Sequence, residues 1–294
     1  MRWLIHSFLS LLSLTPVFAQ AGPDAETESP AFSNVPELMS SFRLLYIQKF
    51  PEARAQFTAW ESQHPGEPFG EVCVAASYLF EEFYRQGVLT SDFFLNEKRF
   101  LHGIEGNPDP ELMQGFDDAI RNIRKLAAQR LAKNPADPEG LFALTLSAGM
   151  ESDADMILKK HNLEALKRLK EANGHAKTLL ALRHDAQDAY VALGSANYII
   201  GSLNAGFRAM LWFGGVHGDK KLGMEQVAKT VEGGRYLKPF AKIMLALAAR
   251  REKQNPLAQK LLRELTEEFP ESPLYAAEYA KAMGRPIPAQ MVHP

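Results

Sequence analysis

The chain has 294 residues, of which 46% are hydrophobic and 23% charged, and its formal net charge is −2. This length and composition fit one large or two ordinary folded domains and exclude a disordered or collagen-like chain. No run of Lys or Arg is longer than two residues. The charge pattern therefore argues against a general nucleic-acid-binding protein, which needs a basic face.

The N-terminal sequence MRWLIHSFLSLLSLTPVFAQAG has the three parts of a secretory signal peptide. Arg2 precedes a mostly apolar stretch, residues 3–14, and small residues at Val17 and Ala19 suit a cleavage site. We expect residues 1–19 to be removed after Ala19 and the mature chain to be exported, either to a bacterial periplasm or as a secreted protein. The acidic segment 20–34 lacks periodicity and is expected to be an unstructured leader.

Helix-start signals recur along the rest of the chain. A capping residue followed by proline recurs, as at Asp109-Pro110, Asp137-Pro138, Asn255-Pro256 and Ser272-Pro273. Between these signals, apolar residues recur three and four positions apart, whereas strand-like alternation is nearly absent. We therefore predict an all-α fold of antiparallel helical hairpins. The predicted helices cover 36–48, 51–63, 68–86, 90–101, 110–133, 138–152, 162–182, 185–203, 205–214, 219–232, 238–253, 256–269 and 273–283.

Two segments share one spacing of alanine, large apolar residues and proline. Each alanine is followed by large residues at offsets 4 and 7 and by proline at offset 12, and it is preceded by a small residue at offset 12. The two sets are Ser41, Ala53, Phe57, Trp60 and Pro65, and Ala246, Ala258, Leu262, Leu265 and Pro270. The spacing resembles that of tetratricopeptide repeats, strongly over residues 37–65 and 242–270 and weakly between them.

This resemblance implies a superhelix, or solenoid, of helical hairpins over residues 35–284, followed by a C-terminal tail, 285–294. Departures from the repeat pattern, such as Ile123 in place of the expected alanine, suggest a degenerate solenoid with a closed or compacted middle. The family resemblance implies protein or peptide binding, or scaffolding, in the cell envelope. The partner would be an unidentified protein or peptide, with no nucleic acid involved.

The C-terminal part also resembles a narrower group of repeat proteins. Gly218-Asp219-Lys220, Gly223, Gly234-Arg235-Tyr236 and Phe269-Pro270 follow a pattern of exported bacterial tetratricopeptide proteins. More distantly, they are similar to a eukaryotic tetratricopeptide family linked to inclusion-body clearance. This resemblance also implies interaction or scaffolding, and it carries no catalytic residue to this chain.

The most site-like polar cluster is His217, Asp219 and Lys220. His217 and Asp219 could hold an anion or a metal at a helix N-terminus, or Asp219 could simply cap the helix that follows it. No recognisable motif for metal, nucleotide or nucleophilic chemistry is present, so we expect no catalytic residue, metal or cofactor and no enzyme activity. The paired carboxylates Asp117-Asp118 and Asp153/Asp155 are interpreted as solvated helix surface.

Two apolar regions leave alternatives open. Aromatic residues gather at 78–100, where core packing is the default and a peptide-binding surface the alternative; the candidates are Tyr78, Phe83, Tyr84, Phe93 and Phe94. The stretch 190–214 is interpreted as two buried helices. A membrane-surface contact without a membrane span is the alternative there, through Phe207, Leu211, Trp212 and Phe213.

Two other functions compete with protein binding. The first is a solute- or lipid-binding protein in which region 78–100 or 190–214 encloses an apolar pocket. The second is an enzyme that uses the 217–220 cluster. The single cysteine, Cys73, excludes an intramolecular disulfide and is interpreted as a core residue.

Overall fold

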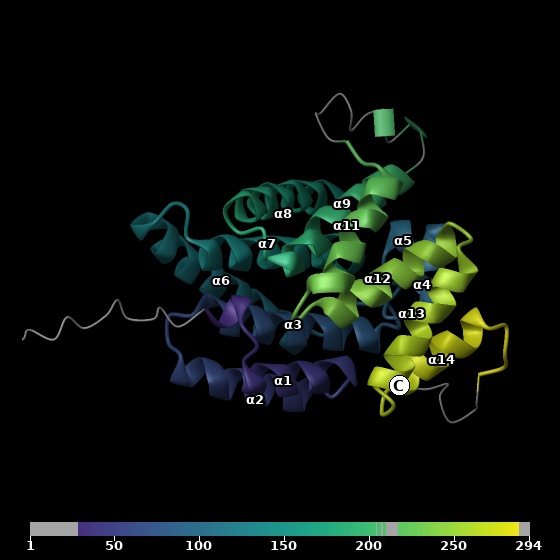
Figure 1. The fold of residues 1–294 in the computed structure, drawn as a ribbon, viewed down its shortest axis with the longest axis horizontal. Helices are drawn as coiled ribbons and strands as arrows, with labels where there is room; N and C mark the ends of the chain where they lie inside the picture. Colours follow the sequence, from purple (N-terminus) through teal and green to yellow (C-terminus); the bar gives the residue numbers. More distant parts are fainter. Residues whose placement is uncertain (1–28, 204, 207, 210–216, 288–294) are drawn as a thin grey trace, which may run out of the picture.

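The computed structural model describes residues 29–203, 205–206, 208–209 and 217–287, and these ranges contain helices and no strand. The prediction of an all-α fold is therefore confirmed. Figure 1 shows the arrangement, with elements η1 (Pro30–Phe32), α1 (Pro36–Tyr46), α2 (Phe50–Gln63), α3 (Pro68–Arg85), α4 (Ser91–Leu95), α5 (Glu97–His102), α6 (Pro110–Lys133), α7 (Pro138–Asp153), η2 (Ala154–Leu158), α8 (Asn162–Leu182), η3 (Gln187–Ala189), α9 (Tyr190–Ser202), α11 (Lys220–Gly233), α12 (Lys238–Arg251), α13 (Asn255–Glu268) and α14 (Pro273–Ala282).

Most helices begin where the sequence signals place them. Asp109 and Asp137 accept backbone N–H bonds at the starts of α6 and α7, and each is followed by a proline in the first turn. The Ser272 hydroxyl does not cap its own helix and instead donates to Gln48 Oε1 at 2.6 Å. Asn255 is already the first residue of α13, whose N-cap is Gln254. Proline, rather than a side-chain cap, therefore marks these last two starts.

Three predicted helices differ in detail. The helix expected over 90–101 is two short helices, α4 and α5, because Asn96 has an extended backbone and its side chain caps α5 at Arg99. The helix that ends at Asp153 continues into a π-helical turn, η2. The helix expected from residue 185 begins with a 3-10 turn before α9.

The first described residues are packed rather than unstructured. Ala31 and Phe32 in η1 are buried, with 3% and 2% of their surface exposed, and the Phe32 ring lies 5.5 Å from that of Phe142 on α7. The leader predicted over 20–34 is thus corrected over its described part, because two apolar side chains anchor it. The predicted signal peptide lies outside the described residues, as do the rest of the leader and residues 288–294 of the tail.

Successive helices pack against one another along the chain, and the two ends of this series meet. The pairs α1–α2, α2–α3, α6–α7, α7–α8, α11–α12, α12–α13 and α13–α14 are in contact. Figure 1 shows α1 beside α13 and α14. There Arg43 on α1 bonds to both carboxylate oxygens of Glu271, each at 2.7 Å, and to the backbone oxygen of Glu268 at 3.0 Å.

A buried joint connects the centre of the chain to its beginning. The Asp188 carboxylate in η3 accepts the backbone N–H groups of Arg235, Tyr236 and Leu237 at 3.0, 3.1 and 3.3 Å. The Tyr236 hydroxyl reaches the N-terminal segment, where it accepts the Val35 N–H at 3.2 Å and lies 2.8 Å from the Ser33 carbonyl oxygen. The loop between α11 and α12 therefore holds η3 and the start of α1 together.

The spacing residues of the two predicted repeats lie mostly at helix contacts. Ser41, Ala53, Phe57, Trp60, Ala246, Ala258, Leu262 and Leu265 are buried, whereas Pro65 and Pro270 are exposed. The Ser41 hydroxyl on α1 bonds to Gln56 on α2 at 2.9 Å. Small residues at these positions allow the paired helices to approach closely.

The predicted helix 205–214 lies mostly outside the described residues. Phe207, Leu211, Trp212 and Phe213, the candidates for a membrane-surface contact, all fall there. Within the described ranges, no helix is long and apolar enough to cross a membrane.

Candidate functional site

The helices enclose an apolar cavity of about 220 Å³. It is larger than the ~150 Å³ apolar cavity that holds a benzene molecule in an engineered protein. Its walls come from almost the whole described chain, chiefly α1, α3, α7, α9, α12 and α14. Both segments that the sequence suggested as pocket walls contribute, Phe80, Phe83, Phe94 and Phe100 from the first and Val191, Ala192, Ser195 and Ile199 from the second.

Helical periodicity explains why whole helix faces line this cavity. On α12, Phe240, Ile243, Met244 and Leu247 recur at spacings of three and four residues, which places them on one face. These side chains are only partly buried although they lie inside the protein, because they border open space. The same periodicity on α7 brings Leu146, Gly149, Met150 and Asp153 to the cavity.

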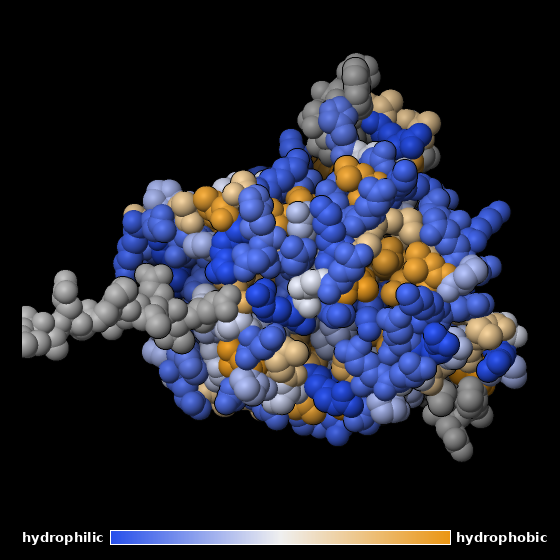
Figure 2. Space-filling view, viewed as in Figure 1, coloured by the Kyte–Doolittle hydropathy of each residue, from blue (hydrophilic) through white to orange (hydrophobic). Residues whose placement is uncertain are grey.

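A smaller hollow of about 60 Å³ adjoins the cavity between α4, α5, α9 and α12. The two spaces share the side chains of Phe94, Phe100, Ile199, Met244 and Leu247. Figure 2 shows apolar surface in this region, where α12 passes α4 and α5. The two spaces therefore adjoin on the side of the cavity where α12 lies near α4 and α5.

One group of charges that borders the cavity is fully paired. Arg250 on α12 donates to the Ser91 hydroxyl and lies 3.5 Å from Glu278 on α14. Lys281 joins Glu278 at 2.9 Å and Asp92 on α4 at 2.7 Å. These contacts tie α4, α12 and α14 together, and they leave the positive charge of Arg250 neutralised.

Asp153 is different, because its carboxyl faces the cavity and makes no hydrogen bond or ion pair with any residue that the structure describes. Part of the side chain is accessible where it borders the open space, but the surrounding protein shields it from bulk water. This burial raises the pKa of Asp153 to about 7. The interpretation of Asp153 as solvated helix surface was wrong, whereas Asp155 does lie beside a cation, 3.7 Å from Lys159.

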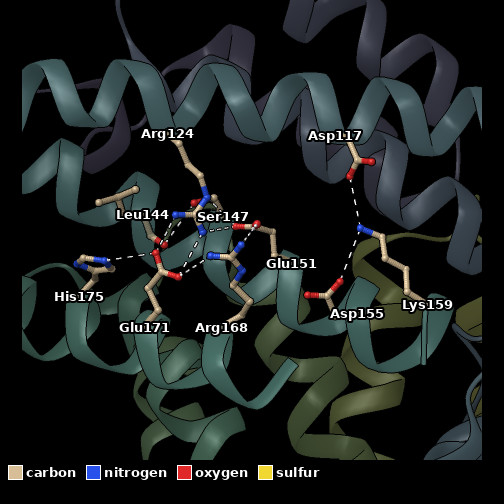
Figure 3. Close-up of polar contacts among 10 residues, drawn as sticks. All are labelled: Asp117, Arg124, Leu144, Ser147, Glu151, Asp155, Lys159, Arg168, Glu171 and His175. Atoms are coloured by element: carbon tan, nitrogen blue, oxygen red, sulfur yellow. Dashed lines mark hydrogen bonds and ion pairs between the residues drawn. The ribbon is translucent and has the colours of Figure 1, made fainter. Parts of the chain in front are cut away.

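The largest described charge network lies away from the cavity, between α6, α7 and α8 (Figure 3). Arg124 bonds to Glu151 and Glu171, at 2.9 Å for its Nε and 2.8 Å for its Nη1, and Arg168 bonds to Glu171 at 3.0 Å. His175 lies 4.0 Å from Glu171, but burial lowers its pKa, so the imidazole is neutral at pH 7. Because the Arg and Glu charges satisfy one another, this network is best explained as a link between three helices.

The paired carboxylates Asp117 and Asp118 also lie beside cations. Asp117 lies 3.5 Å from Lys159, as Figure 3 shows, and Asp118 is paired with Arg121 on the same helix. About half of each carboxyl side chain is exposed. Their interpretation as solvated helix surface agrees with this exposure.

The His217, Asp219 and Lys220 cluster does not converge on a common point. Asp219 caps α11 by accepting the Leu222 N–H at 2.8 Å, and Lys220 turns to Glu252 on α12 at 2.7 Å. His217 is exposed. Of the two interpretations, the structure therefore supports the helix cap.

The aromatic candidates are at least partly buried. Phe83 and Phe93 are core residues, and Phe94 faces the cavity. The Tyr78 ring lies against the Arg54 guanidinium, 4.1 Å from ring centroid to carbon, and Tyr84 packs on Phe50. The default interpretation, core packing, explains all five positions, and a peptide-binding role for them stays a prediction.

The last candidates in the described part of the chain are a metal site and the Cys73 thiol. In the part of the chain that the structure describes, no group of three or more His, Cys, Asp or Glu side chains is placed to hold a metal ion. Burial raises the pKa of the Cys73 thiol, which lines the cavity, well above its usual value.

No family model matches the chain, and neither a curated protein nor a solved structure matches it.

Proposed function

We propose that this protein binds a small, mostly apolar molecule in its internal cavity. The observation that carries the proposal is the cavity itself, about 220 Å³ of space with walls chiefly from six helices. Protein interiors are normally close-packed, and an apolar void costs the contacts that its lining loses. A ligand that fills the space restores those contacts and removes its own apolar surface from water.

The proposed architecture is a closed superhelix of tetratricopeptide-like hairpins. The repeat spacing supports it, as does the regular alternation in which α1, α3, α7, α9, α12 and α14 supply most of the cavity wall. Contacts between Arg43 and Glu271, and between Gln48 and Ser272, close the two ends of the series. In such a closed form the inner face suits a small molecule better than a folded partner.

Export is part of the proposal, on the basis of the N-terminal sequence pattern. A binding protein outside the cytoplasm would carry or sense an apolar compound that is poorly soluble in water. The protein- or peptide-binding hypothesis remains a separate prediction, because the cavity gives no information about binding at the outer surface.

Two glycines provide a matched test. Gly149 on α7 lines the cavity, and a Cβ atom added there would meet nothing within 4 Å. Gly174 on α8 has the same free space but is exposed. Gly149→Phe places a ring in the cavity, whereas Gly174→Phe places one in solvent, and both substitutions remove a helical glycine, which favours the helix.

The measurement is calorimetric titration of the purified mature chain with n-octanol, a neutral amphiphile. We expect the native protein and Gly174→Phe to bind it equally, and Gly149→Phe to bind at least about tenfold more weakly because the ring occupies the site. Thermal unfolding checks that both variants are folded. The proposal fails if the native protein does not bind octanol, or if folded Gly149→Phe binds it as well as the native protein does.

A further inference from the structure

The cavity contains one polar group whose presence the fold does not explain. Asp153 is the last residue of α7, and its carboxyl borders the same space as Gly149, Met150 and Met156. No described residue donates a hydrogen bond to it or carries a charge paired with it. Buried carboxylates in proteins are normally paired or hydrogen-bonded, because an isolated one loses its hydration without compensation.

The unfavourable burial of the Asp153 carboxylate is reflected in its raised pKa. Burial alone raises the pKa of Asp153 to about 7, with no neighbouring charge contributing. A hydrophobic residue of similar volume would avoid that cost and fill more of the cavity. A strongly perturbed acid in an otherwise apolar pocket is the pattern of a ligand-recognition group.

The charges around the cavity favour a cationic ligand. Its charged lining residues are Asp153, Arg250 and Glu278, and Arg250 is already paired with Glu278. This leaves the carboxyl of Asp153 as the unbalanced charge. A ligand carboxylate would meet no available cation among the described lining residues and would be repelled by ionised Asp153.

We propose that the cavity binds a basic amphiphile, in which a protonated amine pairs with the Asp153 carboxylate and the apolar portion lies against α9 and α12. This inference rests on the proposed function and specifies the ligand class. The ammonium group supplies the hydrogen-bond donors and the positive charge that Asp153 lacks. The apolar portion contacts side chains such as Ala192, Ile199 and Leu247, which lead toward the hollow beside α4 and α5.

The experiment compares three probes with the same eight-carbon chain and different head groups: n-octylamine, n-octanol and octanoate. Calorimetric titrations at pH 8, where Asp153 is mostly ionised, are made with the native chain, with Asp153→Asn and with Asp155→Asn. Asp153→Asn keeps the shape and removes the charge. Asp155→Asn is the matched control, because Asp155 lies two residues away and faces Lys159 rather than the cavity.

We expect the native chain to bind octylamine at least about tenfold more tightly than octanol, and octanoate most weakly. Asp153→Asn should lose the preference for octylamine while binding octanol within about twofold of the native value, and Asp155→Asn should retain it. A preference that survives in Asp153→Asn, or a native chain that binds octanol and octylamine equally, overturns the inference but leaves the proposed function standing. If none of the three probes binds the native chain, the proposed function fails and the inference with it.

Discussion

Two aspartates in the described part of the chain are shielded from bulk water, and their settings are very different. Asp188 accepts three backbone N–H groups from the loop between α11 and α12, whereas Asp153 faces an apolar cavity with no described partner. Burial raises the pKa of both, to about 6 for Asp188, where the hydrogen bonds oppose the shift, and to about 7 for Asp153, where nothing opposes it. Burial of a carboxyl therefore does not identify a site, and the presence or lack of partners separates a structural joint from a candidate ligand group.

The largest expected effect comes from breaking the joint. Asp188→Ala removes the acceptor of three buried N–H groups, and each unsatisfied group costs roughly 1–3 kcal/mol. We expect the free energy of unfolding to fall by about 4 kcal/mol, as measured by urea denaturation. The control is Asp185→Ala, because Asp185 has a half-exposed side chain paired with Arg183 and should cost less than about 1 kcal/mol. Equal losses in the two variants would contradict the structural role of Asp188.

The elements of the joint also show how far the sequence predicts the fold. Cap residues, prolines and apolar periodicity are local signals, and they place α6, α7 and α14 almost to the residue. The hydrogen bonds of Asp188 join residues nearly fifty positions apart in the chain, and local sequence patterns do not encode such distant contacts. The Gly234-Arg235-Tyr236 segment stands out in the sequence, but its partner in η3 carries no signal.

The cavity was predictable in part. Regions 78–100 and 190–214 stand out as apolar segments able to enclose a pocket, and both contribute wall residues. As one of a pair of carboxylates with Asp155, Asp153 is interpreted from the sequence as solvated helix surface. It also continues the spacing of Leu146, Gly149 and Met150 on one face of α7. Periodicity can show that a polar residue lies on an apolar helix face. It cannot show whether another helix supplies a hydrogen-bonding or charged partner, because this depends on tertiary packing.

The raised pKa of Asp153 predicts that the stability of the protein depends on pH. An aspartate in the unfolded chain has a pKa of about 3.9, whereas the folded value is about 7, so the folded state holds the proton more tightly. The contribution of this group to the free energy of unfolding is complete below about pH 4 and is lost as the pH rises through about 7. With partial solvent access taken into account, we expect the native chain to lose about 3 kcal/mol over this range through Asp153.

Asp153→Asn should abolish that part of the loss, which urea denaturation at pH 4 and pH 8 would measure. The variant should become more stable than the native chain at pH 8 and differ little at pH 4. The other ionisable groups that line the cavity are common to both proteins and cancel in the comparison; they are Tyr46, Cys73, Arg250, Tyr275 and Glu278. A pH dependence identical in both proteins would show that Asp153 has the same pKa folded and unfolded.

A smaller effect is expected at the far end of the joint. Tyr236→Phe removes the hydroxyl that contacts the Val35 N–H and the Ser33 carbonyl oxygen but keeps the buried ring. The free energy of unfolding should fall by about 1.5 kcal/mol, the range for lost buried hydrogen bonds. Tyr279→Phe is the control, because the structure describes no hydrogen bond for the Tyr279 hydroxyl, and it should change stability by less than about 0.5 kcal/mol. Similar values for both variants would mean that the N-terminal segment does not depend on this contact.

The charge network on α6, α7 and α8 is a third case beside Asp188 and Asp153. Its charges are half-buried but paired with one another. Arg124→Ala leaves Arg168 near both Glu151 and Glu171, at 3.3 and 3.0 Å, so neither carboxylate is stranded. We expect a loss of only about 1 kcal/mol in urea denaturation, and less at high salt, which screens the remaining charges. Arg121→Ala, at an exposed pair with Asp118, should cost less still. A loss at Arg124 as large as that at Asp188 would show that pairing among side chains, rather than bonding to buried backbone, carries the greater share of stability.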